Sequence, residues 1–308
     1  MAAAKRSKVV SYTKWGYIFL IPFFLVYTVF SLVPLISTVY YSFFERYMAM
    51  GGLTQVGPNF IGIQNYITMI TGGGASPEMY KYAWNTLVMW LMGFIPQILV
   101  SLLLGVWFAD TQIRLKGDQF FKTVIYLPNV IMASAFAMIF FMIFSDIGPV
   151  NNIIEAFGGT AVRWLTYTWT TRLLVALMNF LMWFGNTTIT LMAGIMGIDT
   201  SLFEAASVDG ANSIQTFTRI TMPLLKPIFI YTLITSLIGG IQMFDVPQIL
   251  TNGAGSPNNT TMTLIMWLNK HLYSKNYGTS GALSVILFIV TGILSMIIFR
   301  MNTRNDEY

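Results

Sequence analysis

One face of the apolar stretch 172–198 carries the side chains best suited to binding a polar solute. Four of them stand at i, i+3, i+4 and i+7 and therefore share one helical face: they are Asn179, Met182, Trp183 and Asn186. Amides both donate to and accept from hydroxyl groups, and an indole offers a flat apolar surface of the kind that suits a pyranose ring. Hydrocarbon satisfies neither amide, so this face must contact protein or water. Hydrogen bonding of the amides to neighbouring helices, as packing contacts, is the alternative.

A second polar pair, Gln242 and Asp245, lies one helical turn apart in an apolar stretch that predicts a helix from Pro227 to Leu250. The two side chains can face the same cavity and are further candidates for contact with a solute. A rise of ~1.5 Å per residue from Lys226 places Asp245 near the outer edge of a ~30 Å hydrocarbon core. An interfacial carboxylate is therefore the alternative role for Asp245.

Catalytic and metal chemistry find little support in the composition. The chain has no cysteine and a single histidine, His271, so neither thiolate sites nor a histidine cluster is expected. The apolar stretches hold no paired carboxylates and no Ser/His set. The pattern G-x-x-x-x-G-K-S/T is also missing, so any ATP and Mg²⁺ would be bound by a partner and no cofactor is expected in this chain.

The composition predicts an all-α polytopic membrane protein. Of 308 residues, 55% are hydrophobic and 9% charged, and the mean hydropathy is +0.65. The net charge of +5 comes from residues scattered over loops, which does not favour a nucleic-acid partner. Six windows without charged residues are each near or above the ~20 residues that span a bilayer. These six predicted transmembrane helices lie at 15–44, 82–109, 123–145, 173–198, 227–244 and 276–299.

The distribution of Lys and Arg predicts the orientation. With both termini in the cytoplasm, 11 of the 17 basic residues lie inside and 6 outside, as positive-inside orientation requires. The expected organisation is a cytoplasmic tail at 1–14, a transmembrane helix at 15–43, an extracytoplasmic loop with little core of its own at 44–81, a transmembrane domain at 82–300 and a cytoplasmic tail at 301–308.

A polar segment at 199–226 interrupts the apolar sequence on the predicted cytoplasmic side. Ser201 and Glu204 have the spacing of a capping box, which predicts a short helix beginning at Ser201. Gly210 then allows the chain to turn, a second short helix covers 211–219, and Pro223 is expected to stop it and redirect the chain. The sequence therefore predicts a helix-turn-helix elbow outside the bilayer.

The elbow resembles the EAA loop of the permease subunits of type I ABC importers. The pattern is Glu204-Ala205-Ala206, three residues, Gly210, nine residues, then Ile220-Thr221-Met222-Pro223, with Met222 in place of the usual Leu. The segment 60–66 (FIGIQNY), Asn85-Thr86 and the segment 117–123 (GDQFFKT) are similar to elements of the maltose-type, carbohydrate branch of that family, and the resemblance covers nearly the whole chain.

The resemblance implies a transmembrane subunit with the type I permease fold in a bacterial cytoplasmic membrane. In the family the elbow is a coupling helix seated in a cleft of an ATPase, which assigns that role to Glu204, Ala205, Ala206, Asp209, Gly210 and Pro223. Glu204 as a simple helix cap is the alternative. The implied partners are a second, usually non-identical permease, two ATPase subunits and an extracytoplasmic solute-binding protein. The resemblance also implies that the helical face that carries Asn179 forms the sugar site.

The expected solute is a neutral oligosaccharide, because an anion would favour Arg or Lys within the spans. A polyol, a glycerol phosphate or a peptide is the alternative within the same class. An ion-coupled secondary transporter would need embedded ionisable residues, for which Asp245 is the only candidate.

Overall fold

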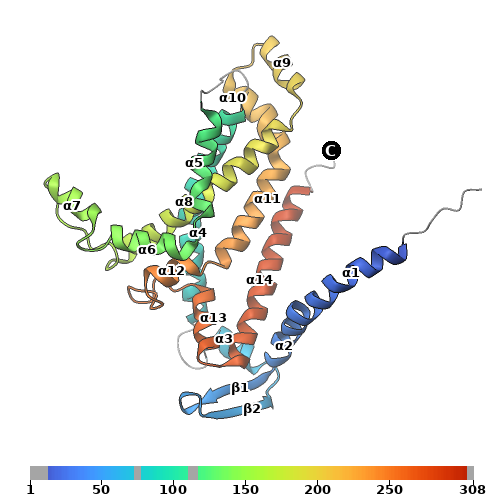
Figure 1. The fold of residues 1–308 in the computed structure, drawn as a ribbon, viewed down its shortest axis with the longest axis vertical. Helices are drawn as coiled ribbons and strands as arrows, with labels where there is room; N and C mark the ends of the chain where they lie inside the picture. Colours follow the sequence, from blue (N-terminus) through green and yellow to red (C-terminus); the bar gives the residue numbers. More distant parts are fainter. Residues whose placement is uncertain (1–12, 73–77, 110–116, 304–308) are drawn as a thin grey trace, which may run out of the picture. The chain divides into compact units, whose positions relative to one another are not determined.

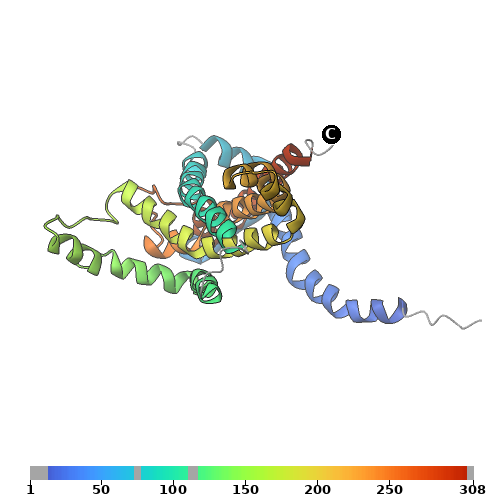
Figure 2. The ribbon, with the colours of Figure 1, turned by 90° about the horizontal axis from the view of Figure 1, so that it is seen from above.

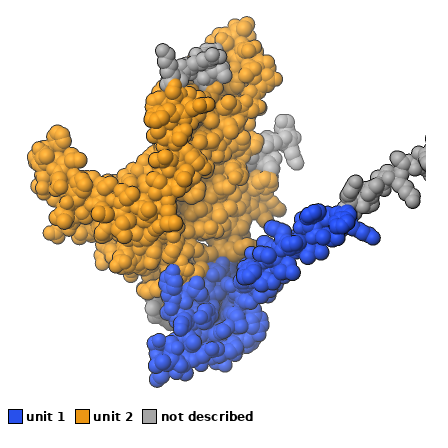
Figure 3. Space-filling model, viewed as in Figure 1, with its two compact units in different colours: residues 1–68, 271–285 blue, residues 69–270, 286–308 orange. Residues whose placement is uncertain are grey.

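The computed structural model describes residues 13–72, 78–109 and 117–303, and this part of the chain is mainly helical (Figure 1). It divides into two compact units (Figure 3). Unit 1 comprises residues 1–68 and 271–285, and unit 2 comprises residues 69–270 and 286–308. The tails predicted at 1–14 and 301–308 lie largely outside the described residues.

Within the described residues, five helices are long and apolar enough to cross a membrane, and a sixth span is obtained if one sharply bent pair of helices counts as one. The five cover Lys14–Tyr41, Glu78–Ala109, Thr168–Met196, Ser213–Leu250 and Tyr277–Arg300. They match five of the six predicted windows. The bent pair, Asp118–Val130 and Ala133–Ile143, covers the remaining window, 123–145.

The first span consists of α1 (Thr13–Tyr27), a π turn η1 (Thr28–Leu32) and α2 (Val33–Tyr41). The π turn lies directly before Pro34, whose ring and missing N–H do not fit a continuing α-helix. No residue of the apolar window of this span is buried, so its surface is free for lipid or for another subunit.

The segment after the first span contains a β-hairpin, although the sequence predicted a loop without a core. Strands β1 (Phe44–Ala49) and β2 (Thr54–Phe60) pair antiparallel, joined by the 3-10 turn η2 (Met50–Gly52), and the rings of Phe44 and Phe60 lie 5.4 Å apart. Gly57 and Pro58 interrupt β2, so the alternating pattern that marks a strand was not visible.

The motif at 60–66 fixes the base of this hairpin. The Asn65 amide at the start of α3 (Gln64–Thr71) donates to the carbonyls of Ser42 and Phe44 at 2.9 and 3.0 Å. The Tyr66 hydroxyl lies 2.6 Å from the Ser42 hydroxyl. The motif therefore has a structural use in unit 1.

Unit 2 is built on α4 (Glu78–Ala109) and α8 (Thr168–Met196), which pack along their lengths. Gly93 allows the close approach, because a Cβ there would lie 3.0 Å from the Ala176 carbonyl oxygen. Ser101 donates to the Phe184 carbonyl at 2.8 Å and adds a polar link between the two helices.

The third window is not one helix. It forms α5 (Asp118–Val130) and α6 (Ala133–Ile143), which meet at 93° (Figure 2). Extended residues 131–132 break the helix, and Asn129 at the end of α5 donates to the Met182 carbonyl on α8 at 3.0 Å. The predicted continuous helix across 123–145 is therefore wrong. A short helix, α7 (Pro149–Ala156), follows this pair.

The fifth window is also interrupted. α11 (Met222–Ile241) ends before residues 242–244, and α12 (Asp245–Leu250) follows, so the predicted single helix to Leu250 is wrong. Pro247 accounts for the break, because it cannot donate to the Met243 carbonyl four residues earlier and its ring would clash there. α13 (Leu264–Tyr273) and α14 (Tyr277–Thr303) complete the chain.

Candidate functional site

The elbow begins with α9 (Thr200–Val208), which is capped by Asp199. The Asp199 Oδ1 accepts a hydrogen bond from the Ser201 backbone N–H at 2.9 Å. That bond, aided by the Ser201 side chain, lowers the pKa of Asp199 below its usual value. The predicted cap at Ser201 is wrong, because Asp199 precedes it with a better acceptor. Glu204 lies in the body of α9 and is exposed.

Gly210 turns the chain as expected, with a backbone φ of +75°. Asn212 then forms a capping box with Gln215, with both hydrogen bonds between 2.8 and 2.9 Å, and opens α10 (Ser213–Thr216). A π turn, η4 (Phe217–Thr221), leads directly into α11. Pro223 does not redirect the chain, as the sequence had suggested. It follows the π turn η4 within the continuous helical path, as Pro34 follows η1, and the extra residue of the π turn accommodates its ring and its missing N–H.

The elbow presents an exposed surface at one end of unit 2 (Figure 1). Of the residues predicted for coupling, Glu204, Ala205, Asp209, Gly210 and Pro223 are exposed, whereas Ala206 is buried. Large apolar side chains lie on the same surface, and Val208 is 87% exposed. α10, η4 and α11 follow one another without a break, so the second part of the elbow is continuous with α11.

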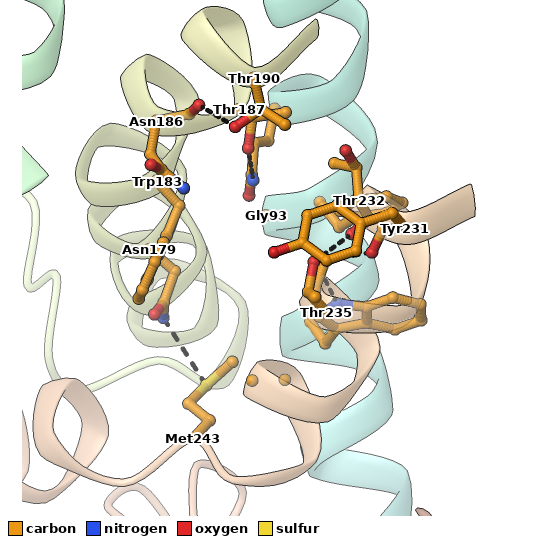
Figure 4. Close-up of a pocket in the computed structure, with 16 residues that line it drawn as sticks. Gly93, Asn179, Trp183, Asn186, Thr187, Thr190, Tyr231, Thr232, Thr235 and Met243 are labelled. Carbon is orange, nitrogen blue, oxygen red and sulfur yellow. Dashed lines mark hydrogen bonds between the residues drawn. The ribbon is translucent and has the colours of Figure 1, made fainter. Parts of the chain in front are cut away.

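A cavity of ≈ 400 Å³ lies between α4, α8 and α11 in unit 2 (Figure 4). Its lining combines amides, hydroxyls and indoles with small apolar groups. The lining residues are Trp90, Gly93, Phe94, Gln97, Asn179, Trp183, Asn186, Thr187, Thr190, Tyr231, Thr232, Thr235, Ser236, Gly239, Gly240 and Met243. No Asp, Glu, Lys or Arg is among these lining residues.

Hydrogen bonds between helices hold several of the polar groups. Gln97 Nε2 on α4 donates to Thr187 Oγ1 on α8 at 2.7 Å. Asn179 Nδ2 donates to the Val175 carbonyl at 2.9 Å and lies 3.6 Å from the Met243 sulfur (Figure 4). These bonds leave the Asn179 carbonyl and further donors and acceptors on the wall for a solute.

The structure brings together three of the six residues predicted to contact solute. Asn179, Trp183 and Asn186 line the cavity. Met182 is 7% exposed and belongs to the apolar core around Met178, because α8 turns that side of the shared face towards α5 and α6. Gln242 and Asp245 are exposed and are not among the lining residues, although Met243 between them is.

Sequence reasoning missed the contributions of α4 and α11. Gln97 is a lone amide within an apolar helix, which is the same signal that identified Asn179. Thr232, Thr235 and Ser236 stand at i, i+3 and i+4 and so mark one face of α11. Both signals were available from the sequence. Neither shows by itself that these faces meet the face of α8.

The fold and the site together define a polytopic membrane protein with a polar, uncharged cavity and an exposed elbow. The family described as "Binding-protein-dependent transport system inner membrane component" matches residues 101–305. The chain is 30% identical to the arabinooligosaccharides transport system permease protein AraP of Bacillus subtilis (strain 168), over 93% of this chain and 88% of the relative. It is 29% identical to the lactose transport system permease protein LacF of Rhizobium radiobacter, over 97% and 98% of the two chains.

A solved structure has the same fold. A chain in the crystal structure of a bacterial ABC transporter that imports the acidic polysaccharide alginate superposes with a TM-score of 0.79 at 23% identity, covering 94% of this chain and 96% of that chain. This chain belongs to the family of inner membrane components of binding-protein-dependent transport systems. It is a permease subunit of an ABC importer, a transport component rather than an enzyme.

Proposed function

We propose that this subunit forms part of the path by which a neutral oligosaccharide crosses the membrane. The observation that carries the proposal is the cavity wall, where amides, hydroxyls and indoles gather without a charged side chain. Such a wall can exchange hydrogen bonds with sugar hydroxyls and pack a flat ring against a pyranose face. An anionic solute would meet hydrogen-bond donors there but no Lys or Arg to offset the desolvation of its charge.

The names of the relatives support a carbohydrate. AraP and LacF are named for arabinooligosaccharides and lactose, which are neutral sugars. A further relative, MsmF of Streptococcus mutans, is named as a multiple sugar-binding transport system permease protein and is 28% identical over 94% of this chain. The side chains proposed to contact the sugar on α8 are those of Asn179, Trp183 and Asn186.

The elbow is proposed to dock an ATPase subunit. Val208 on α9 and Ile214 on α10 present exposed apolar surface beside Glu204 and Asp209, which suits a cleft in a soluble partner. ATP-driven closure of two ATPase subunits would move α9, and the continuous path through η4 would carry that motion to the α11 wall of the cavity. Ala206, which is buried, would anchor α9 rather than touch the partner.

The remaining partners and the orientation follow from the same proposal. The exposed apolar surface of α1, η1 and α2 suits a second, non-identical permease, and a solute-binding protein would deliver the sugar from outside. Both termini and the elbow would lie in the cytoplasm of a bacterial cell, as the basic residues indicate. The segment at 44–81, with the hairpin, would then be extracytoplasmic.

Reconstitution tests the proposal. The complete transporter, in vesicles with its cognate binding protein, is offered a panel of neutral oligosaccharides, a uronic-acid oligosaccharide and a peptide of similar size. We expect only neutral oligosaccharides to stimulate ATP hydrolysis and to accumulate. Stimulation by the acidic saccharide or by the peptide alone would contradict the proposed solute. Uptake driven by a proton gradient without ATP would favour an ion-coupled carrier instead.

A further inference from the structure

A buried arginine lies in unit 2 away from the cavity. Arg172, in the first turns of α8, is 8% exposed, and its Nη2 donates to Oδ1 of Asn85 on α4 at 2.6 Å. Asn85 is itself 2% exposed. Burying a guanidinium group costs free energy unless its N–H donors are hydrogen-bonded. The hydrogen-bond partners of this pair therefore indicate what its burial stabilises. The proposed solute contacts do not include it.

Arg172 and Asn85 hold one segment of backbone, residues 259–263. Arg172 Nε donates to the Thr260 carbonyl at 3.0 Å. Asn85 Nδ2 donates to the carbonyls of Asn259 and Met262 at 2.8 and 3.2 Å. All of these acceptors are main-chain oxygens. The pair therefore fixes where the segment lies and is indifferent to its side chains.

The conformation of this segment needs such support. Asn259 has a φ of +55° and the preceding Asn258 a φ of +51°, a region that costs non-glycine residues energy unless surrounding contacts hold them there. At its other end, Thr86 Oγ1 on α4 accepts from the Leu264 backbone N–H at 3.1 Å. The segment is thus held to α4 at both ends and to α8 in between.

The same segment holds a wall of the cavity. Thr263 Oγ1 donates to the Met243 carbonyl at 2.8 Å, and this oxygen is available because Pro247 has no N–H to reach it. The Met243 sulfur in turn accepts from Asn179 Nδ2 at 3.6 Å. Met243 lines the cavity at the end opposite Asn186 and Thr190 (Figure 4), which are the lining residues of α8 nearest the elbow in the chain.

We propose that Arg172 and Asn85 are positioning residues that, through segment 259–263, keep Met243 closed over the end of the solute cavity opposite the elbow. The inference rests on the proposed function in taking this cavity as the solute path. Release of the segment would free Met243 from Thr263 and open that end of the cavity. Arg172 and Asn85 would then set the access to the path without touching solute.

The chain has no cysteine, so a single introduced thiol reports on this closure. The probe is Met243→Cys in the complete transporter in vesicles, labelled with a membrane-impermeant maleimide in the absence of sugar and ATP. We expect slow labelling with Arg172 and Asn85 present, and labelling at least ~10-fold faster when Arg172→Met or Asn85→Ala is added. Arg163→Met, which removes an exposed arginine of the predicted outer side, is the matched control and should leave the rate unchanged.

A second variant guards against a folding defect in the Arg172 variant. Thr263→Val keeps the shape of the side chain and the Arg172–Asn85 pair. It deletes the bond to Met243, together with the bond that Thr263 Oγ1 accepts from the Met266 backbone N–H at 3.2 Å, and it should also speed labelling. Unchanged labelling in Thr263→Val and in assembled Arg172→Met would overturn the proposal, even if uptake falls. Because labelling is measured without solute, it is independent of the solute panel, so a wrong solute class and a wrong positioning role give different results.

Discussion

The Trp90 indole nitrogen donates a hydrogen bond to the Ser236 hydroxyl at 3.1 Å, which joins α4 to α11 at the wall of the cavity. The Trp90 ring also stacks on Phe94 with their centroids 5.2 Å apart. Gly240 makes room for that ring, since a Cβ at this position would lie 2.2 Å from the indole Cδ1. The turn of α11 that contains Gly240 is therefore shaped to accommodate the Trp90 indole.

Gly240→Ala should therefore disrupt the contact between α4 and α11. Overpacking of this kind costs about 1–3 kcal/mol, and the displaced indole would also leave the cavity wall. The neighbouring Gly239→Ala is the matched control, because nothing lies within 4 Å of its added Cβ. Because Gly239 also lines the cavity, thermal unfolding of the assembled transporter, rather than sugar uptake, measures the difference. Equal stability of the two variants would refute the fit of Gly240 to Trp90.

Trp183 and Met182 are neighbours on α8 with opposite environments, and their variants should separate solute binding from packing. Trp183 is 48% exposed at the cavity, so Trp183→Ala should raise the KM for sugar about 10-fold or more while the transporter still assembles. Met182 lies in the core, so Met182→Ala should cost about 2–5 kcal/mol of stability with little change in KM. A Trp183 variant that assembles poorly, and whose assembled fraction has an unchanged KM, would support the packing role.

Gly210→Ala should uncouple ATP hydrolysis from uptake. Its φ of +75° disfavours a side chain by about 1 kcal/mol, which would change the angle between α9 and α10. Gly210→Asn is the matched variant, because Asn adopts this conformation more readily. We expect a lower ratio of sugar transported to ATP hydrolysed in the Ala variant and partial recovery in the Asn variant. An unchanged ratio in Gly210→Ala would contradict the coupling role.

The cap of α9 should weaken in acid. The folded state lowers the pKa of Asp199 below its usual value of 3.8, so the stabilisation is complete above that pH and is lost as the pH falls through the lowered pKa. Asp199→Asn keeps an acceptor but cannot titrate. Hydrogen exchange of the α9 amides, corrected for intrinsic rates, should accelerate as the pH falls below 3.8 in the natural chain and stay level in the variant. If the exchange rates of the natural chain and of the variant changed with pH in the same way, Asp199 would be excluded as the titrating group.

The sequence predicted the spans well because hydrocarbon imposes one strong requirement, a long run of apolar residues without charges. It failed where a local break depends on tertiary partners. Pro247 is an example. It interrupts the helix and leaves the Met243 carbonyl without a partner in the helix. Only the fold shows that Thr263, which is distant in the sequence, binds this carbonyl. The bend between α5 and α6 had no equally clear mark, although Asn129 at that point is anchored to Met182.

Only part of the site was predicted, for a related reason. Asn179, Trp183 and Asn186 could be identified because two amides cannot face lipid. Periodicity alone did not show that Met182, on the same nominal face, is covered by other helices. Arg172 was counted only as an outer surface charge, and its burial beside Asn85 became visible only in the fold.

The most direct test of the central claim is accumulation of a labelled neutral oligosaccharide by vesicles that contain the complete transporter, with ATP inside and the loaded binding protein outside. The natural chain should accumulate sugar only with ATP, and Glu204→Ala should insert and assemble normally yet accumulate little while ATP hydrolysis continues. Equal accumulation by the two chains, or accumulation in vesicles without ATP, would contradict an ATP-driven permease coupled through this elbow.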